Sequence, residues 1–100
     1  MNGGENMSNT EVVKQIIEEH NNSIDYYINV TLPQKLRRQG YEVVDGRISV
    51  DAWFAAQRLI VEEHFHDKAA ALCSALRAFG YDVKRDAQTH KLIWNGGLIE

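Results

Sequence analysis

The sequence LRRQGYEV at residues 36–43 returns in a similar form, LRAFGYDV, at residues 76–83, forty positions further along the chain. In both stretches a helical run with Leu and Arg meets a glycine, and a β-prone segment follows. Glycine adopts positive φ without strain and commonly ends a helix. The two stretches therefore predict two corners at which a helix ends and a hairpin begins.

A second similarity lies upstream of the corners, where IIEEH at residues 16–20 resembles IVEEH at residues 60–64. The offset there is 44 positions, and the difference from 40 is close to one helical turn. We therefore expect an α+β fold with an internal α-β-β duplication. It would hold a small antiparallel sheet of two hairpins, about four strands, with helices packed on one face. Chance similarity is the alternative, because many unrelated chains turn a corner with a helix, a glycine, an aromatic residue and then a strand.

Length and composition indicate one globular domain. The chain has 100 residues, of which 44% are hydrophobic and 25% charged, and its net charge is -3. We expect a disordered leader at residues 1–9, a single domain at 10–97 and a tail at 98–100. A lone cysteine, Cys73, excludes an intrachain disulfide and fits a reducing, cytoplasmic location. No apolar run approaches the roughly 18 residues that a membrane span needs, so no membrane partner is expected.

The N-terminal half contains one clear helix and one ambiguous segment. Apolar side chains at helical spacing from Val13 predict a helix over about residues 10–21. Residues 24–31 alternate with a period of two, which favours a strand, but they also continue the helical stripe, so both interpretations stay open. Pro33 suits a first helical turn, and we expect a fresh short helix that runs to Gln39 before Gly40 ends it.

The pair Asp45-Gly46 is typical of a two-residue hairpin turn, which would place Val44 opposite Arg47. The strands on either side would put four apolar residues on the core face of the sheet. These are Tyr41, Val43, Ile48 and Val50.

Residues 51–79 form either one long helix or two. Asp51 is a plausible N-cap, and 29 helical residues would reach about 43 Å. Because this exceeds the diameter of a domain of this size, roughly 26 Å, a break is the alternative, with residues 64–68 as its place and Asp67 as a second cap. In the second hairpin, a four-residue turn at 86–89 would set Val83 opposite Leu92, Tyr81 opposite Trp94, and Lys84 opposite Lys91.

Few residues point to catalysis or to metal binding. Glu63 and His66 have the Glu-x-x-His spacing of di-iron helical bundles, but the matching upstream segment has no histidine at that spacing, so we expect no metal and no cofactor. Seven helical residues separate His66 from Cys73 by about 10 Å, too far for a base and its nucleophile. Cys73 is better interpreted as a small buried hydrophobe. No catalytic motif is present, and we expect no enzyme.

Charge is distributed unevenly along the chain. Acids outnumber bases in residues 1–30 and 51–70, whereas bases outnumber acids in 31–50 and 71–100. This pattern predicts a protein with one acidic face and one basic face.

We expect a non-enzymatic protein-interaction module, an adaptor or inhibitor of the kind that phages and mobile elements encode, which binds another protein or assembles into a homo-oligomer. The alternative is a nucleic-acid or anion-binding protein with a basic patch. The candidate binding residues are Arg37, Arg38, Arg47, Lys84, Arg85 and Lys91, with the outer-face residues Val44 and Ile93.

Overall fold

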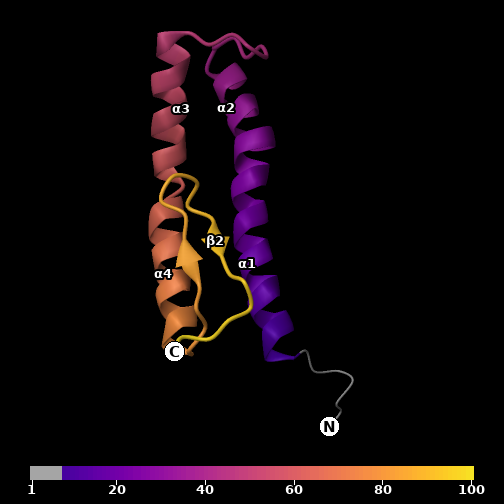
Figure 1. The fold of residues 1–100 in the computed structure, drawn as a ribbon. Coiled ribbons are helices and arrows are strands. Elements are labelled where there is room, and N and C mark those ends of the chain that lie inside the picture. Colours follow the sequence, from indigo (N-terminus) through magenta and orange to yellow (C-terminus); the bar gives the residue numbers. More distant parts are fainter. Residues whose placement is uncertain (1–7) are drawn as a thin grey trace. The chain divides into compact units, whose positions relative to one another are not determined.

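The computed structural model describes residues 8–100, which divide into two compact units. The hairpin unit runs to Asn22 and resumes from His66 to Glu100, and the helical unit comprises Ser23–Phe65. The coarse prediction of helices with a small antiparallel sheet is confirmed (Figure 1). The elements are α1 (Asn9–Tyr26), the π-helix η2 (Tyr27–Thr31), α2 (Leu32–Arg38), α3 (Val50–Glu62), α4 (Phe65–Ala78), β1 (Lys84–Arg85) and β2 (Leu92–Ile93).

Residues 24–31 are helical, so the strand interpretation of this segment is wrong. Ile24 and Tyr27 are buried while Tyr26 and Ile28 are exposed, which follows the helical period and not a period of two. The end of this segment is a π-turn, in which the Leu32 amide donates to the Tyr27 carbonyl. A wider turn of this kind cannot be read from spacing alone. The expected leader at 1–9 lies mostly outside the described residues, and α1 already begins at Asn9.

The helix end predicted at the first corner is confirmed. Gly40 has a φ of 91°, and its amide donates to the Arg37 carbonyl at 3.0 Å. The Tyr41 amide reaches back to the Leu36 carbonyl, also at 3.0 Å. This pair of hydrogen bonds defines a Schellman motif, in which a glycine in the left-handed region satisfies the last carbonyls of α2.

The second corner repeats this geometry residue by residue. Gly80 has a φ of 95° and donates to the Arg77 carbonyl at 2.9 Å, while the Tyr81 amide donates to the Leu76 carbonyl at 3.2 Å. Tyr41 packs against the core that contains Leu36, and Tyr81 packs against the core of the hairpin unit. The two Gly-Tyr corners are therefore the same local structure used twice.

The chain that follows the first corner does not form the predicted hairpin. The pair Val44 and Arg47 forms an isolated bridge, with a hydrogen bond of 3.1 Å from the Arg47 amide to the Val44 carbonyl. Ile48 and Val50 are exposed and do not join the core. The reason is the cap of α3: the Ser49 hydroxyl accepts from the Ala52 amide at 3.1 Å, which draws Val50 into the helix. Ser49, and not Asp51, is the N-cap.

The second hairpin forms, but its register is shifted by two residues. Lys84 pairs with Ile93 and Arg85 with Leu92, so Lys84 does not lie opposite Lys91. The turn begins one residue later than predicted, because the Asp86 carboxylate accepts from the amides of Gln88 and Thr89. Asp favours this position just before a turn. A shift of two keeps each side chain on its predicted face, and the rings of Tyr81 and Trp94 still meet, with centroids 5.7 Å apart.

The described residues contain one two-stranded sheet and not four strands, and they show no clear duplication. The corners match, whereas the segments after them differ. The chain after the second corner is also held by residues near the C-terminus. Leu98 forms an isolated antiparallel β-bridge with Tyr81, and the Ile99 amide donates to the Gly80 carbonyl at 2.8 Å. At the first corner, the residues that would take the place of this C-terminal segment form helix α3 (Val50–Glu62) instead.

Residues 51–79 form two helices, as one of the two interpretations predicted. α3 ends at Glu62, His64 has a φ of 56°, and α4 begins at Phe65. Asp67 lies in the first turn of α4 and does not precede it as a cap. A carboxylate in a first helical turn interacts favourably with the helix dipole.

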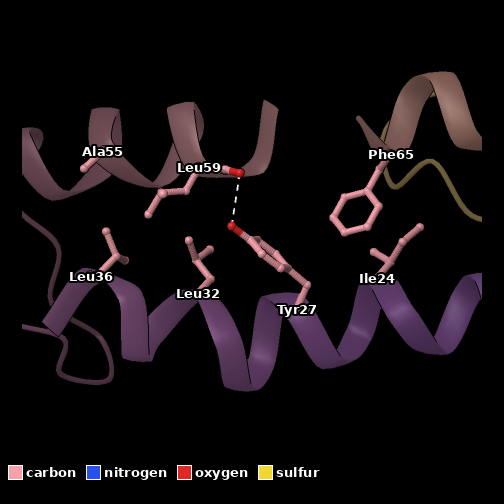
Figure 2. Packing of buried hydrophobic residues seen from close by; sticks show 7 residues of the cluster. All are labelled: Ile24, Tyr27, Leu32, Leu36, Ala55, Leu59 and Phe65. Atoms are coloured by element: carbon pink, nitrogen blue, oxygen red, sulfur yellow. Dashed lines mark hydrogen bonds between the residues drawn. The ribbon is translucent and has the colours of Figure 1, made fainter. Parts of the chain in front are cut away.

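Each unit has its own core. In the hairpin unit, β1 lies beside α4 and β2 beside α1 (Figure 1). Six side chains from these helices and from the hairpin meet there: Val13, Ile17, Ala69, Leu76, Val83 and Leu92. In the helical unit, the chain through η2 and α2 faces α3, and seven side chains fill the space between them (Figure 2). These are Ile24, Tyr27, Leu32, Leu36, Ala55, Leu59 and Phe65.

Candidate interaction surfaces

Helix α3 carries apolar side chains on two opposite sides. Ala55 and Leu59 are buried in the core, whereas Val50 is 69%, Phe54 56% and Val61 69% exposed. The three exposed residues fall within about 40° of one another around the helix axis at 3.6 residues per turn. Exposed apolar side chains that gather on one side of a helix are typical of a surface that a partner covers. Within residues 8–100, this side of α3 is left exposed.

The exposed residues of α3 follow the spacing of a coiled coil. Val50, Phe54, Gln57 and Val61 are separated by four, three and four positions, as the a and d residues of a heptad are. We call these four residues the α3 seam. Three exposed residues flank it: Asp51 and Arg58, which are one heptad apart along one edge, and Trp53 along the other.

Four of the candidate binding residues lie in the helical unit: Arg37, Arg38, Val44 and Arg47. The Arg37 guanidinium donates to the Val43 carbonyl at 3.4 Å, which is a contact that supports the corner. Arg47 lies 3.9 Å from the Glu42 carboxylate in an exposed ion pair. Val44 and Arg47 line a hollow of about 170 Å³ with Glu42, Ile48 and Ser49. Arg37 and Arg38 do not line this hollow.

The other four candidates lie in the hairpin unit: Lys84, Arg85, Lys91 and Ile93. Lys84 and Arg85 line a groove of about 350 Å³ between α4 and the start of the hairpin. Lys91 does not line it, and Ile93 remains an exposed apolar residue next to Lys84 in the sheet. The groove contains residues that the sequence analysis did not select, Ser74 and Arg77. Their spacing of three on a helix was the signal that could have found them.

Arg77 has the same structural task as Arg37. Its guanidinium donates to the Val83 carbonyl at 3.1 Å and to the Asp82 carboxylate at 3.0 Å. The pairs Arg37 with Val43 and Arg77 with Val83 are again forty positions apart. The first Arg of each repeated stretch thus ties its corner to the segment that follows.

Polar side chains of α1 hold the hairpin. The Asn21 amide nitrogen donates to the Leu92 carbonyl at 3.0 Å, and the Leu92 amide donates to the Asn21 oxygen at 2.8 Å. Buried His20 donates through Nε2 to the His90 carbonyl at 2.8 Å. These contacts satisfy backbone groups of β2 and of the residues just before it, so they are structural.

A second polar cluster surrounds Tyr27 in the helical unit. The Lys35 amino group lies 5.3 Å from the centre of the Tyr27 ring and 4.0 Å from the Glu63 carboxylate. Burial raises the pKa of Tyr27, and the negative charges of Glu63 and then Glu62 raise it further. A phenol with a raised pKa stays protonated and donates a hydrogen bond; it is a poor nucleophile.

The Glu-x-x-His spacing does not form a metal centre in the structure. Glu63 pairs with Lys35, while His66 lies 3.4 Å from both Asp67 and Arg85. Within residues 8–100, no three His, Cys, Asp or Glu side chains gather as a metal-binding group. The Cys73 thiol donates to the Val83 carbonyl at 3.3 Å and packs against the core of the hairpin unit, but the side chain is half-buried and not fully buried as predicted.

Comparison of the chain with protein-family models, with curated proteins and with solved structures gives no match. Among the helices of residues 8–100, none combines the length and the apolar character that crossing a lipid bilayer requires.

Proposed function

We propose that the protein is a non-catalytic protein-interaction module, and that it self-associates through the α3 seam. The observation that supports this most directly is the exposure of Val50, Phe54 and Val61 on a helix whose opposite side is already buried. Contiguous apolar surface of this kind marks interaction sites. A module of this class acts by occupying its partner, as adaptors and inhibitors do.

The charges beside the seam argue for a second copy of the chain as the partner. Asp51 and Arg58 occupy the same heptad position on the same edge of α3. In an antiparallel pair of helices, equivalent edges face each other, so Asp51 of each copy meets Arg58 of the other. The described part of the chain gives neither residue an ion-pair partner of its own. A dimer with a two-fold axis therefore forms two equivalent ion pairs, each between Asp51 of one copy and Arg58 of the other.

The same arrangement pairs the apolar side chains. When Asp51 faces Arg58 of the second copy, Val50 meets Val61 across the axis and Phe54 packs beside Gln57. Trp53 then lies next to Ile60, which is partly buried in its own unit. One antiparallel register therefore covers the seam and both of its edges at once.

The size of the surface sets the expected strength of assembly. The 13 residues of α3 extend over about 20 Å. An interface built on one such helix is small, below the roughly 1,200 Å² of a standard interface, and interfaces of that size are transient. We therefore expect a dimer that forms and dissociates with protein concentration.

Sedimentation equilibrium over a wide concentration range tests the proposal. The wild-type chain should change from monomer to dimer, and Phe54→Glu should weaken the dimer at least tenfold, because it buries a charge in the seam. Phe79→Glu is the matched control, since Phe79 is 80% exposed but lies in the hairpin unit. A strictly monomeric mass at the highest concentration would overturn self-association. A dimer that survives Phe54→Glu would show that another surface carries it.

A further inference from the structure

The groove between α4 and β1 in the hairpin unit has an unusual concentration of positive charge. Three of the seven residues that line it are basic, Arg77, Lys84 and Arg85, and none is acidic. Its volume of about 350 Å³ lies within the range of roughly 300 to 1,000 Å³ found for small-molecule sites. The other four lining residues are Ala70, Cys73, Ser74 and Val83.

The ion pairs within the unit leave part of this charge uncompensated. Arg77 is paired with Asp82 at 3.0 Å. Arg85 contacts a histidine nitrogen, at 3.4 Å from His66, and not a carboxylate. Lys84 has no ion-pair partner among residues 8–100. The groove therefore keeps a surplus of positive charge at neutral pH.

The donors in the groove come from two elements. Ser74 and Arg77 are three residues apart on α4, so their side chains lie on the same face of that helix. Lys84 and Arg85 are supplied by β1, whose start is held against α4 by the Cys73 thiol and the Arg77 guanidinium. Both contacts reach the Val83 carbonyl, which fixes the spacing between the two elements. The groove is thus built by the core contacts of the unit.

We infer that this groove binds the phosphate group of a small molecule. A doubly charged tetrahedral anion accepts hydrogen bonds from Lys, Arg and hydroxyl donors together, and residues of these three types line the groove. A nucleic-acid strand is a poorer fit, because it requires cations in a row along several phosphates. The part of α1 that belongs to this unit carries Glu11, Glu18 and Glu19 against one lysine, Lys14. This inference is independent of the α3 seam.

An NMR titration of the full chain with inorganic phosphate tests the site, with sodium chloride used to hold the ionic strength constant. We expect amide shifts at Ser74, Arg77, Lys84 and Arg85. Lys84→Ala should weaken binding roughly ten- to a hundredfold, since it removes a charge-assisted hydrogen bond. Lys14→Ala is the matched control, because Lys14 is an exposed lysine of the same unit outside the groove. It should leave the affinity unchanged.

Three further arms complete the experiment. Glycerol phosphate that binds more tightly than inorganic phosphate would identify the ligand as a phosphate ester, and the reverse order would identify free phosphate. A single-stranded oligonucleotide without terminal phosphates should bind more weakly than either; tighter binding, with shifts that spread to Arg38 or Lys91, would overturn the inference in favour of nucleic acid. The titration repeated on Phe54→Glu should be unchanged, which separates this site from the dimer proposal.

Two results of the phosphate titration would overturn the inference directly. One is the same set of shifts with chloride alone, which would indicate unspecific screening. The other is an equal loss of affinity in Lys84→Ala and Lys14→Ala, which would indicate that only net charge matters. Dispersed amide spectra of both variants in the absence of phosphate show that each is folded, so that a loss of binding reports on the groove.

Discussion

The hydroxyl of Tyr27 donates a hydrogen bond of 3.0 Å to the carbonyl oxygen of Leu59, across the core of the helical unit (Figure 2). Leu59 lies in the last turn of α3, where carbonyls lose their helical partners. The amide of Glu63 donates to the Ile60 carbonyl instead of the Leu59 carbonyl. A side chain from the π-helix thus satisfies a backbone group at the end of α3, near the break before α4.

Replacement of Tyr27 by phenylalanine removes that donor and leaves the Leu59 carbonyl buried without a partner. We expect Tyr27→Phe to lower the free energy of unfolding by about 1–3 kcal/mol, the cost of an unsatisfied buried group. Urea denaturation followed by circular dichroism measures the change. Tyr26→Phe is the control, since the adjacent Tyr26 is exposed and should change stability little. Equal stability of the two variants would contradict the structural role of this hydrogen bond.

The raised pKa of Tyr27 should also make the free energy of unfolding depend on pH in the alkaline range. Its pKa is raised above the ordinary value of 10.0, chiefly by burial. A group with a higher pKa in the folded chain contributes stability that is fully present below its unfolded pKa, and this stability is lost as the pH rises through the folded pKa. The wild-type chain should therefore lose stability above about pH 10, more steeply than Tyr27→Phe. Urea midpoints measured at a series of alkaline pH values would show parallel curves if Tyr27 did not take part.

Asn21 should be the most sensitive polar residue of the hairpin unit. It satisfies both the amide and the carbonyl of Leu92, and Asn21→Ala leaves both without their side-chain partner. We expect a loss of about 2–3 kcal/mol and faster hydrogen exchange at the Leu92 amide. Asn22→Ala, at the exposed neighbouring position, serves as the control. Unchanged exchange at Leu92 in Asn21→Ala would show that the strand is held by other contacts.

The two corners make a matched pair for testing backbone strain. Gly40 and Gly80 have positive φ values, and a Cβ added at either would meet nothing within 4 Å. Any cost of Gly→Ala is therefore conformational, and we expect roughly 1–2 kcal/mol at each corner. Gly→Asn should cost less, because Asn tolerates the left-handed region. Thermal denaturation of the four variants measures this, and an Ala variant as stable as the wild type would contradict the Schellman geometry at that corner.

These two glycines also show what the sequence could predict. A glycine after a Leu-Arg helical run and before an aromatic residue has few local alternatives, so both corners were foreseeable. The structure of residues 24–31 was not, because Tyr27 fits a strand and a helix equally in spacing. Its burial against Leu59 decides between them, and that contact joins residues 32 positions apart.

The predicted pairing of the hairpins was wrong where a side chain made a hydrogen bond that competed with it. The alternating pattern places Ser49 in a strand, but its hydroxyl caps α3. The cap makes Val50 the first residue of the helix, so Val50 cannot pair in a sheet. Asp86 moves the second turn by one residue through its side-chain hydrogen bonds. For the candidate site, the sequence selected Lys84 and Arg85 but missed Arg77, since the groove exists only when α4 and β1 pack together.

The orientation of the proposed dimer can be tested by reversing its charges. Asp51→Arg places two arginines opposite each other in the antiparallel register, and Arg58→Asp places two aspartates there, so each single variant should weaken the dimer. The double variant Asp51→Arg with Arg58→Asp restores opposite charges across the two-fold axis and should recover most of the wild-type affinity.

Asp51→Arg also places a cation in the first turn of α3, which disfavours the helix by about 0.3–1 kcal/mol, and the double variant keeps this cost. Recovery of affinity in sedimentation equilibrium therefore reports on pairing between copies. Affinity that remained as low as in the worse single variant would exclude the antiparallel register, because no other alignment of α3 with its copy relies on both reciprocal pairs.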